Sequence, residues 1–282
     1  MFTSLIIGLR ETLEAALVVG IVIGYLNRTG QSRYIRMAWM GVGIGTALSI
    51  IGAIAFDRLA GGFEGTAEAL YEGIAMITGA ILITTLIFWM MRRQQLMAEI
   101  HADLDRHITN AHPMGIFWVV LVAILREGIE MAIFLGSARM IDPDHSFIGA
   151  LIGIIIAISI GYGLYRGFLR INLTRFFAIT GIMLMLFAAG LLAHGIHELQ
   201  EAGAISFWSH QVWDINPSVT ETGVYPPLHE NGYLGSIIKG LFGYNGNPTL
   251  LEVSAYLLYL SVITVLWWRM FSRNSTQNAR QT

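Results

Sequence analysis

The chain has 282 residues, of which 55% are hydrophobic and 13% are charged, and its mean hydropathy is +0.60. A soluble domain of this length would carry about a quarter charged residues, so the composition indicates an integral membrane protein. The formal net charge of −2, with no concentrated basic segment, argues against a nucleic-acid partner, and the absence of cysteine excludes disulfides, thiolate metal sites and thiol catalysis.

Seven apolar segments are long enough to cross a bilayer as helices, which takes about 20 residues each. In chain order they are 3–26, 37–56, 69–91, 114–138, 147–165, 176–196 and 250–268. The first does not resemble a cleavable signal peptide, because it lacks a basic leader, is too long and contains charged residues. We therefore predict an all-α integral membrane protein with seven transmembrane helices.

The connections between these spans differ in charge, which predicts the orientation. Three Lys or Arg residues occur in each of the segments 27–36, 92–113 and 166–175 and in the tail after Trp268, against one in each of 57–68, 139–146 and 197–249. Basic residues collect on the cytoplasmic side of a membrane. We therefore expect the N-terminus outside and the C-terminus in the cytoplasm.

Two spans are interrupted by charged residues in the same pattern, R-E-x-x-E. The residues are Arg10, Glu11 and Glu14 in the first span and Arg126, Glu127 and Glu130 in the fourth. Charges at such depth cost at least about 2.5–3.5 kcal/mol each and usually mark ion pathways. The two Glu of each motif share a helix face, and we expect each Arg to pair with the Glu four residues later. A pair that only fixes packing would need one Glu, whereas four carboxylates and two guanidinium groups leave about −2 for a multivalent cation.

The two motifs begin 116 residues and three spans apart, so their helices run in opposite directions. This is the pattern of a 3+3 inverted repeat, in which substrate binds near the midplane. At about 1.5 Å rise per residue, both Glu pairs lie roughly 12–18 Å below the outer face. We predict one transmembrane domain, 1–268, made of repeat one (about 1–91), repeat two (about 114–196), an outer loop (197–249) and helix seven (250–268), followed by a cytoplasmic tail (269–282).

Carboxylates without a thiolate suit hard cations such as Fe³⁺, Mn²⁺, Mg²⁺ or Ca²⁺, with Fe²⁺ borderline, and ligand chemistry alone does not choose among them. A membrane di-iron carboxylate oxidoreductase is the alternative from another class. Such sites use Glu-x-x-His pairs, and neither motif has a His at that offset. A purely structural membrane subunit is a third alternative.

The motifs read RETLE at 10–14 and REGIE at 126–130. With this doubled motif the chain resembles the oxidase-dependent iron transporter family of fungal and bacterial iron permeases, whose signature is R-E-G-L-E in helices one and four. Segments 70–74 (LYEGI), 197–203 (HELQEAG) and 240–244 (GLFGY) extend the resemblance over nearly the whole chain.

The resemblance implies a permease rather than an enzyme, one that imports iron, as Fe²⁺ or Fe³⁺, across the cytoplasmic membrane without an organic cofactor. It implies that Glu11, Glu14, Glu127 and Glu130 are the iron ligands. Relatives for other metals such as lead keep the motif, so lead and manganese stay open as alternative substrates.

The resemblance also implies an extracytoplasmic oxidase or iron-binding protein as a partner, and the outer loop, with Glu221 and Glu230, offers it an acidic docking surface. The chain departs from the family signature at two positions. Thr12 replaces the usual Gly and adds a hydroxyl that either crowds the first motif or supplies a ligand, and Ile129 replaces Leu.

Further acidic and histidine residues lie at the predicted outer helix ends. Those that could line the entrance of the ion path are Glu72, His197, Glu198 and Glu201. The last three follow His194 in the pattern H-x-x-H-E-x-x-E, which is not the zinc-protease motif. Solvated, hydrogen-bonded helix ends are the alternative, and for Glu252, at the start of helix seven, favourable placement in the helix dipole is the favoured interpretation.

The segment 204–248 has no apolar run long enough to span, and we expect short interfacial helices around Trp208 and Trp213. Three pairs of glycines spaced four residues apart permit close helix contact: Gly20/Gly24, Gly41/Gly45 and Gly149/Gly153. No glycine-rich loop followed by Lys-Ser/Thr is present, so the chain does not hydrolyse ATP.

Overall fold

Each segment predicted to cross the membrane lies within a helix of the computed structural model, which describes residues 1–60, 65–92, 113–141, 146–169, 171–216, 225–227, 229 and 232–278. These helices are α1 (Phe2–Arg28), α2 (Ile35–Ala60), α3 (Thr66–Arg92), α5 (Pro113–Ile141), α6 (Ser146–Tyr165), α7 (Leu173–Glu201) and α9 (Leu250–Asn278). Helix α9 therefore extends ten residues beyond the predicted span, into the segment expected to be a tail. Glu221 and Glu230 lie outside the described residues.

Within the described residues, five helices are long and apolar enough to cross a membrane: α2, α3, α6, α7 and α9. Helices α1 and α5 are also long enough, at 27 and 29 residues. Each of them carries an R-E-x-x-E motif near its middle, and these charges lower its apolar character. The charge that sets α1 and α5 apart is thus the same charge that makes them candidates for the functional site.

The helices form two compact units, which are described separately. Unit 1 comprises Met1–Phe63 and Thr85–Ile182, and unit 2 comprises Glu64–Thr84 and Met183–Thr282.

Small residues on α2 and α6 determine the packing of unit 1. A Cβ on Gly153 of α6 would lie 2.2 Å from the Leu5 carbonyl oxygen of α1, and a Cβ on Gly45 of α2 would lie 2.9 Å from Ile124 of α5. Only a glycine, which has no Cβ, fits at such distances. These glycines therefore allow α6 to lie directly against α1 and α2 directly against α5. By contrast, in the part of the chain that the structure describes, no neighbouring helix comes within 4 Å of a Cβ on Gly20 or Gly24.

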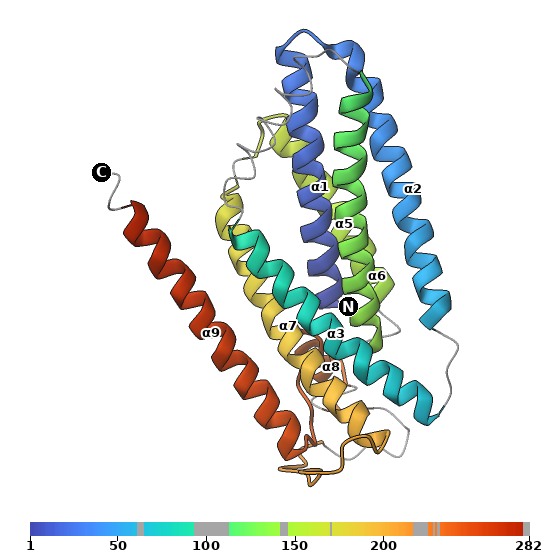
Figure 1. Cartoon of the computed structure of the whole chain (residues 1–282), viewed down its shortest axis with the longest axis vertical. Helices are drawn as coiled ribbons and strands as arrows, with labels where there is room; N and C mark the ends of the chain where they lie inside the picture. The colour runs from blue at the N-terminus through green and yellow to red at the C-terminus, as the bar shows by residue number, and fades with distance from the viewer. Residues whose placement is uncertain are drawn as a thin grey trace. The chain divides into compact units, whose positions relative to one another are not determined.

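Helices α1 and α5 are antiparallel neighbours. Val22 and Leu26, near the end of α1, pack in one buried cluster with Ile116 and Val120, near the start of α5. Figure 1 shows α1 and α5 side by side, with α2 along the other side of α5. This arrangement brings the middle of α1 and the middle of α5 to the same level.

In unit 2, α3 and α7 also approach through glycines, since a Cβ on Gly73 would lie 2.8 Å from the Gly195 carbonyl oxygen. The helix α8 (Tyr233–Phe242) ends at Gly243, whose φ of 68° and close approach to Gly190 of α7 both require glycine. The interfacial helices expected around Trp208 and Trp213 are not observed. Residues 205–216 form turns and bends with a single bridge from Gln211 to Thr249.

Candidate functional site

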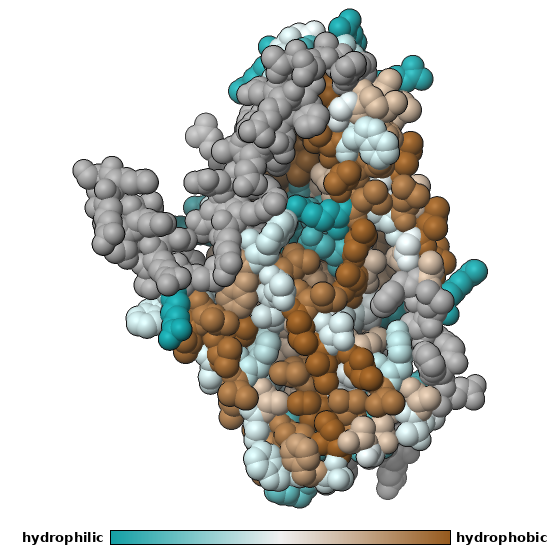
Figure 2. Space-filling model, in the orientation of Figure 1, coloured by the Kyte–Doolittle hydropathy of each residue, from teal (hydrophilic) through white to brown (hydrophobic). Residues whose placement is uncertain are grey.

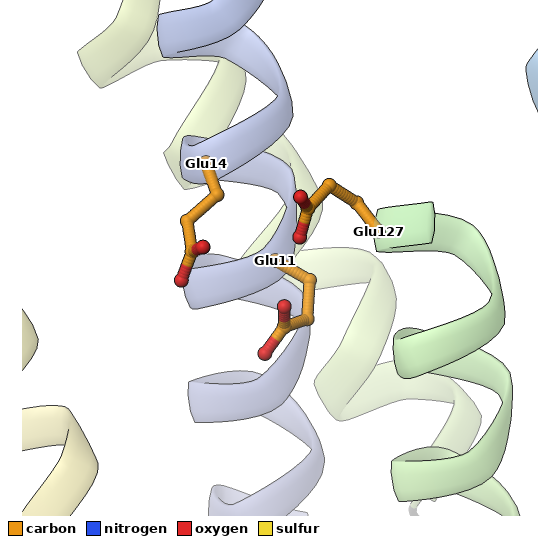
Figure 3. A group of neighbouring side chains, drawn as sticks. All are labelled: Glu11, Glu14 and Glu127. Carbon is orange, nitrogen blue, oxygen red and sulfur yellow. The ribbon is translucent and has the colours of Figure 1, made fainter. Parts of the chain in front are cut away.

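The two charged motifs meet where α1 and α5 lie side by side. Glu11 and Glu14 project from one face of α1, and Glu127 reaches toward them from α5 (Figure 3). One carboxylate oxygen of each of these three residues lies within 4.8 Å of the other two. Helical periodicity places positions i and i+3 on one face, and the antiparallel contact places the second motif opposite the first.

These carboxylates are almost fully enclosed by protein. The exposed fractions are 0% for Glu11, 6% for Glu14, 2% for Glu127 and 7% for Glu130. Within the described residues, one oxygen in each of the first three, Glu11 Oε2, Glu14 Oε1 and Glu127 Oε2, has no hydrogen-bond partner, although Glu14 Oε1 also lies 3.5 Å from the Arg10 guanidinium group. Buried polar atoms without a partner are rare, because each one loses its hydration without compensation. A bound cation would supply that compensation.

Figure 2 shows hydrophilic atoms recessed among hydrophobic ones partway along this face of the molecule.

Each arginine contacts the predicted glutamate, four residues later, and also the adjacent glutamate, which lies closer. Arg10 lies 3.5 Å from Glu14, the expected partner, but only 2.8 Å from the adjacent Glu11. Likewise, Arg126 Nε donates to Glu127 Oε1 at 3.0 Å and lies 3.5 Å from Glu130. Each guanidinium group therefore bridges both glutamates of its motif, so that two cations are shared among four carboxylates.

The two motifs also differ in burial. The Arg10 side chain is 1% exposed, whereas that of Arg126 is 33% exposed and lies over the Trp89 ring, with 5.2 Å from its guanidinium carbon to the ring centroid. Arg126 therefore combines its ion pairs with a cation–π contact at a partly exposed position, whereas Arg10 is fully enclosed.

Glu130 was expected to join the other three glutamates, but it does not belong to the group whose oxygens lie within 4.8 Å. It remains in the same electrostatic cluster, because the Arg10 guanidinium interacts with all four carboxylates. Together the four carboxylates and two guanidinium groups leave a net charge of about −2 in a water-poor environment, which favours a multivalent hard cation.

Ser49 of α2 is a neighbour of the site that sequence reasoning missed. A Cβ on Gly128 would lie 1.9 Å from Ser49 Oγ and 2.3 Å from Ser49 Cβ, and both residues line the same cavity as Glu11, Thr12 and Glu127. The glycine of the REGIE motif therefore leaves room for a side chain from α2. Each motif consequently has one hydroxyl close by, Thr12 within the first and Ser49 beside the second.

This contact predicts that Gly128→Ala loses about 1–3 kcal/mol of stability, because overpacking displaces α2 from α5. The melting temperature of the detergent-solubilised protein should fall, and Ser49→Gly in the same chain should restore it. Gly52→Ala is the matched control, since among the described residues no atom of another helix lies within 4 Å of its Cβ position. Unchanged melting of Gly128→Ala would contradict this packing.

The candidate entrance residues lie in unit 2, where Glu198 interacts electrostatically with Glu72. Glu72 was expected at the start of the third helix. Helix α3 instead begins at Thr66, so Glu68 is the acidic residue in its first turn and Glu72 lies further along the helix.

His197 has a partner at each ring nitrogen, since Nδ1 lies 3.0 Å from Glu252 Oε1 and Nε2 lies 3.4 Å from Glu201 Oε1. The Glu252 carboxylate accepts a hydrogen bond from the Thr249 N–H at 3.0 Å, and the Thr249 hydroxyl accepts one from the Glu252 N–H at 3.4 Å. This reciprocal pair is a capping box at the start of α9, readable in the sequence as T-x-x-E. Glu252 thus stabilises the start of α9, in line with the favoured interpretation that it has a structural role. It also holds His197 in place.

Comparison with known proteins agrees with the resemblance indicated by the two motifs. The family model of the Iron permease FTR1 family matches residues 1–277. The chain is 32% identical over 273 residues to the ferrous iron permease EfeU of Yersinia pestis, covering 95% of this chain and 93% of that protein. It is 32% identical over 266 residues to the ferrous iron permease EfeU of Escherichia coli O6:K15:H31, covering 92% of each. No solved structure matches the chain significantly.

Proposed function

Because the chain belongs to the iron permease FTR1 family, we propose that it imports iron across the cytoplasmic membrane through a site formed by Glu11, Glu14, Glu127 and Glu130. The family consists of transporters, not enzymes, and the apolar helices make this a multi-pass membrane protein. The observation that carries the proposal is the approach of three buried carboxylates from α1 and α5 to within 4.8 Å of one another.

In the proposed mechanism the glutamates replace water around the ion. Carboxylate oxygens bind hard cations at about 2–2.6 Å, so small rotations of the three side chains suffice to close a shell around one ion. Arg10 and Arg126 hold the carboxylates in place when no ion is bound. They also keep the net charge near −2, so that the bound ion is nearly neutralised and can be released.

The proposed topology has seven crossings, with α1 and α5 added to the five apolar helices, the N-terminus outside and the C-terminus in the cytoplasm. The packing supports a 3+3 repeat, because α1 packs on α6 in the way that α5 packs on α2. Gly149 and Gly153 contact Met1, Leu5 and Leu9, whereas Gly41 and Gly45 contact the corresponding part of α5. The proposal keeps the single transmembrane domain predicted from the sequence, with α9 continuing beyond it to Asn278.

The outer side is proposed to receive iron from an extracytoplasmic oxidase or iron-binding protein, with Glu72, His197, Glu198 and Glu201 at the entrance of the path. The interaction of Glu72 with Glu198 supports this, because two neighbouring acids attract a cation. His197 serves there chiefly to orient Glu201, since its other nitrogen is held by Glu252.

The direct test is uptake of radioactive iron by the purified protein in proteoliposomes, with and without a reductant. We expect accumulation above that of protein-free liposomes, and the reductant arm identifies the oxidation state that passes. Competition by Mn²⁺ and Pb²⁺ measures selectivity. Accumulation no greater than that of protein-free liposomes in both arms would contradict a permease that works alone.

A further inference from the structure

An elongated apolar cavity of about 870 Å³ lies within unit 1, between α1, α2, α5 and α6. Its walls are largely apolar, and along α1 they extend from Glu11 to Asn27. This stretch corresponds to about 24 Å of helix, which exceeds half of the hydrocarbon thickness of about 30 Å. The cavity is therefore long enough to accept a lipid acyl chain that enters from one leaflet.

One end of this cavity is polar. Helices α1 and α6 are parallel, so their last turns meet there, and Asn27 Nδ2 donates a hydrogen bond to Tyr165 Oη at 3.2 Å. Arg166 Nε donates to Tyr162 Oη at 3.0 Å, and the Arg166 guanidinium lies 5.4 Å from the centroid of the same ring. Tyr162, Tyr165 and Asn27 all line the cavity, so hydrogen-bonding groups surround its mouth.

Basic residues adjoin the lining of the mouth in the sequence. Three exposed arginines each follow directly after a residue that lines the cavity: Arg28 after Asn27, Arg36 after Ile35 and Arg166 after Tyr165. The sequence has no acidic residue between Glu14 and Asp57 or between Asp144 and Glu198. The charge on α1, α2 and α6 at this end is therefore not neutralised by acids of their own segments.

We propose that this cavity binds an anionic phospholipid, with an acyl chain along the apolar walls and the phosphate held by Arg28, Arg36 and Arg166. Arginines beside an apolar groove at the cytoplasmic face match such a lipid in both charge and depth. The inner part of the same cavity is lined by Glu11 and Glu127. The bound acyl chain therefore closes the side of the carboxylate site that faces the cavity. It prevents an ion from moving sideways out of the site into the hydrocarbon core of the membrane.

The test measures lipid binding by the full-length protein and does not depend on iron transport. Purified protein is titrated with phosphatidylglycerol or phosphatidylcholine of identical acyl chains, and native mass spectrometry and melting temperature are recorded. We expect phosphatidylglycerol to be retained preferentially and to raise the melting temperature. Replacing Arg28, Arg36 and Arg166 together by Gln should reduce the preference roughly a hundredfold, at about fivefold for each arginine. Arg58→Gln, at the opposite end of α2, is the control and should change nothing.

A second pair of variants examines the apolar walls. Gly20 lines the cavity and Gly24 does not, and neither has an atom within 4 Å of its Cβ position. Gly20→Phe should fill the cavity and abolish retention of phosphatidylglycerol, whereas Gly24→Phe should retain it. Equal retention of both lipids by the unaltered protein would overturn the proposal, as would retention by Gly20→Phe. Dimers that exclude lipid would overturn it in favour of a second copy of the chain as the occupant.

Discussion

Replacing Glu11, Glu14 or Glu127 by Gln is expected to reduce iron uptake in proteoliposomes by more than about tenfold. A loss of about tenfold is the smallest usually seen when a residue that only hydrogen-bonds a metal ligand is replaced, and here the ligand itself is replaced. Gln keeps the size of the side chain but removes one negative charge and one strong ligand from a site of about −2. The three carboxylates lie within 4.8 Å of one another, so each one is a direct ligand in the proposed site. Glu130→Gln should have a smaller effect, because Glu130 lies outside this group.

The controls separate loss of binding from loss of folding. Each variant should elute as the unaltered protein does in size-exclusion chromatography, because a neutral amide relieves charge repulsion. Iron should raise the melting temperature of the unaltered protein and not of the three variants. Glu72→Gln, in unit 2, is the comparison and should reduce uptake only weakly. Normal uptake by any of the three variants would remove that glutamate from the site, and normal uptake by all of them would end the proposal.

Arg10→Ala is expected to cost about 3–5 kcal/mol of folding stability, the range for removing one partner of a buried ion pair. Arg10 is 1% exposed and is bound to Glu11 at 2.8 Å, so its loss leaves buried carboxylates without compensation. The measurement is the melting temperature and yield of folded protein after solubilisation. Both should fall together with transport.

Arg126→Ala is the matched comparison, since Arg126 has the same position in the second motif. Its side chain is 33% exposed, so solvation partly compensates the remaining charges and the loss should be smaller. Adding Glu11→Gln to Arg10→Ala should recover folded protein without recovering uptake, because the uncompensated charge is then gone. Equal losses of folding stability for the two arginine variants would contradict the prediction that the more buried arginine contributes more.

The sequence by itself determined the class of the protein and the position of its charged motifs. The apolar segments predict the long helices, because a span needs about 20 residues whatever its neighbours are. The spacing of Glu11 and Glu14, together with an odd number of spans before Glu127, predicts a shared face and opposed helices. The family membership also follows from RETLE and REGIE, since the doubled motif is local sequence.

Only the tertiary structure decided how these residues meet. Helical period fixes which residues share a face, but not how far a helix is rotated about its axis against its neighbours. In unit 1 that rotation is set by Gly45 against Ile124 and by Gly153 against Leu5, contacts between segments far apart in the chain. As a consequence three carboxylates approach closely while Glu130 lies outside their group. Spacing predicted an Arg10–Glu14 pair, but the enclosing helices decided that the closer partner of Arg10 is Glu11, because side-chain conformation depends on the space that packing leaves.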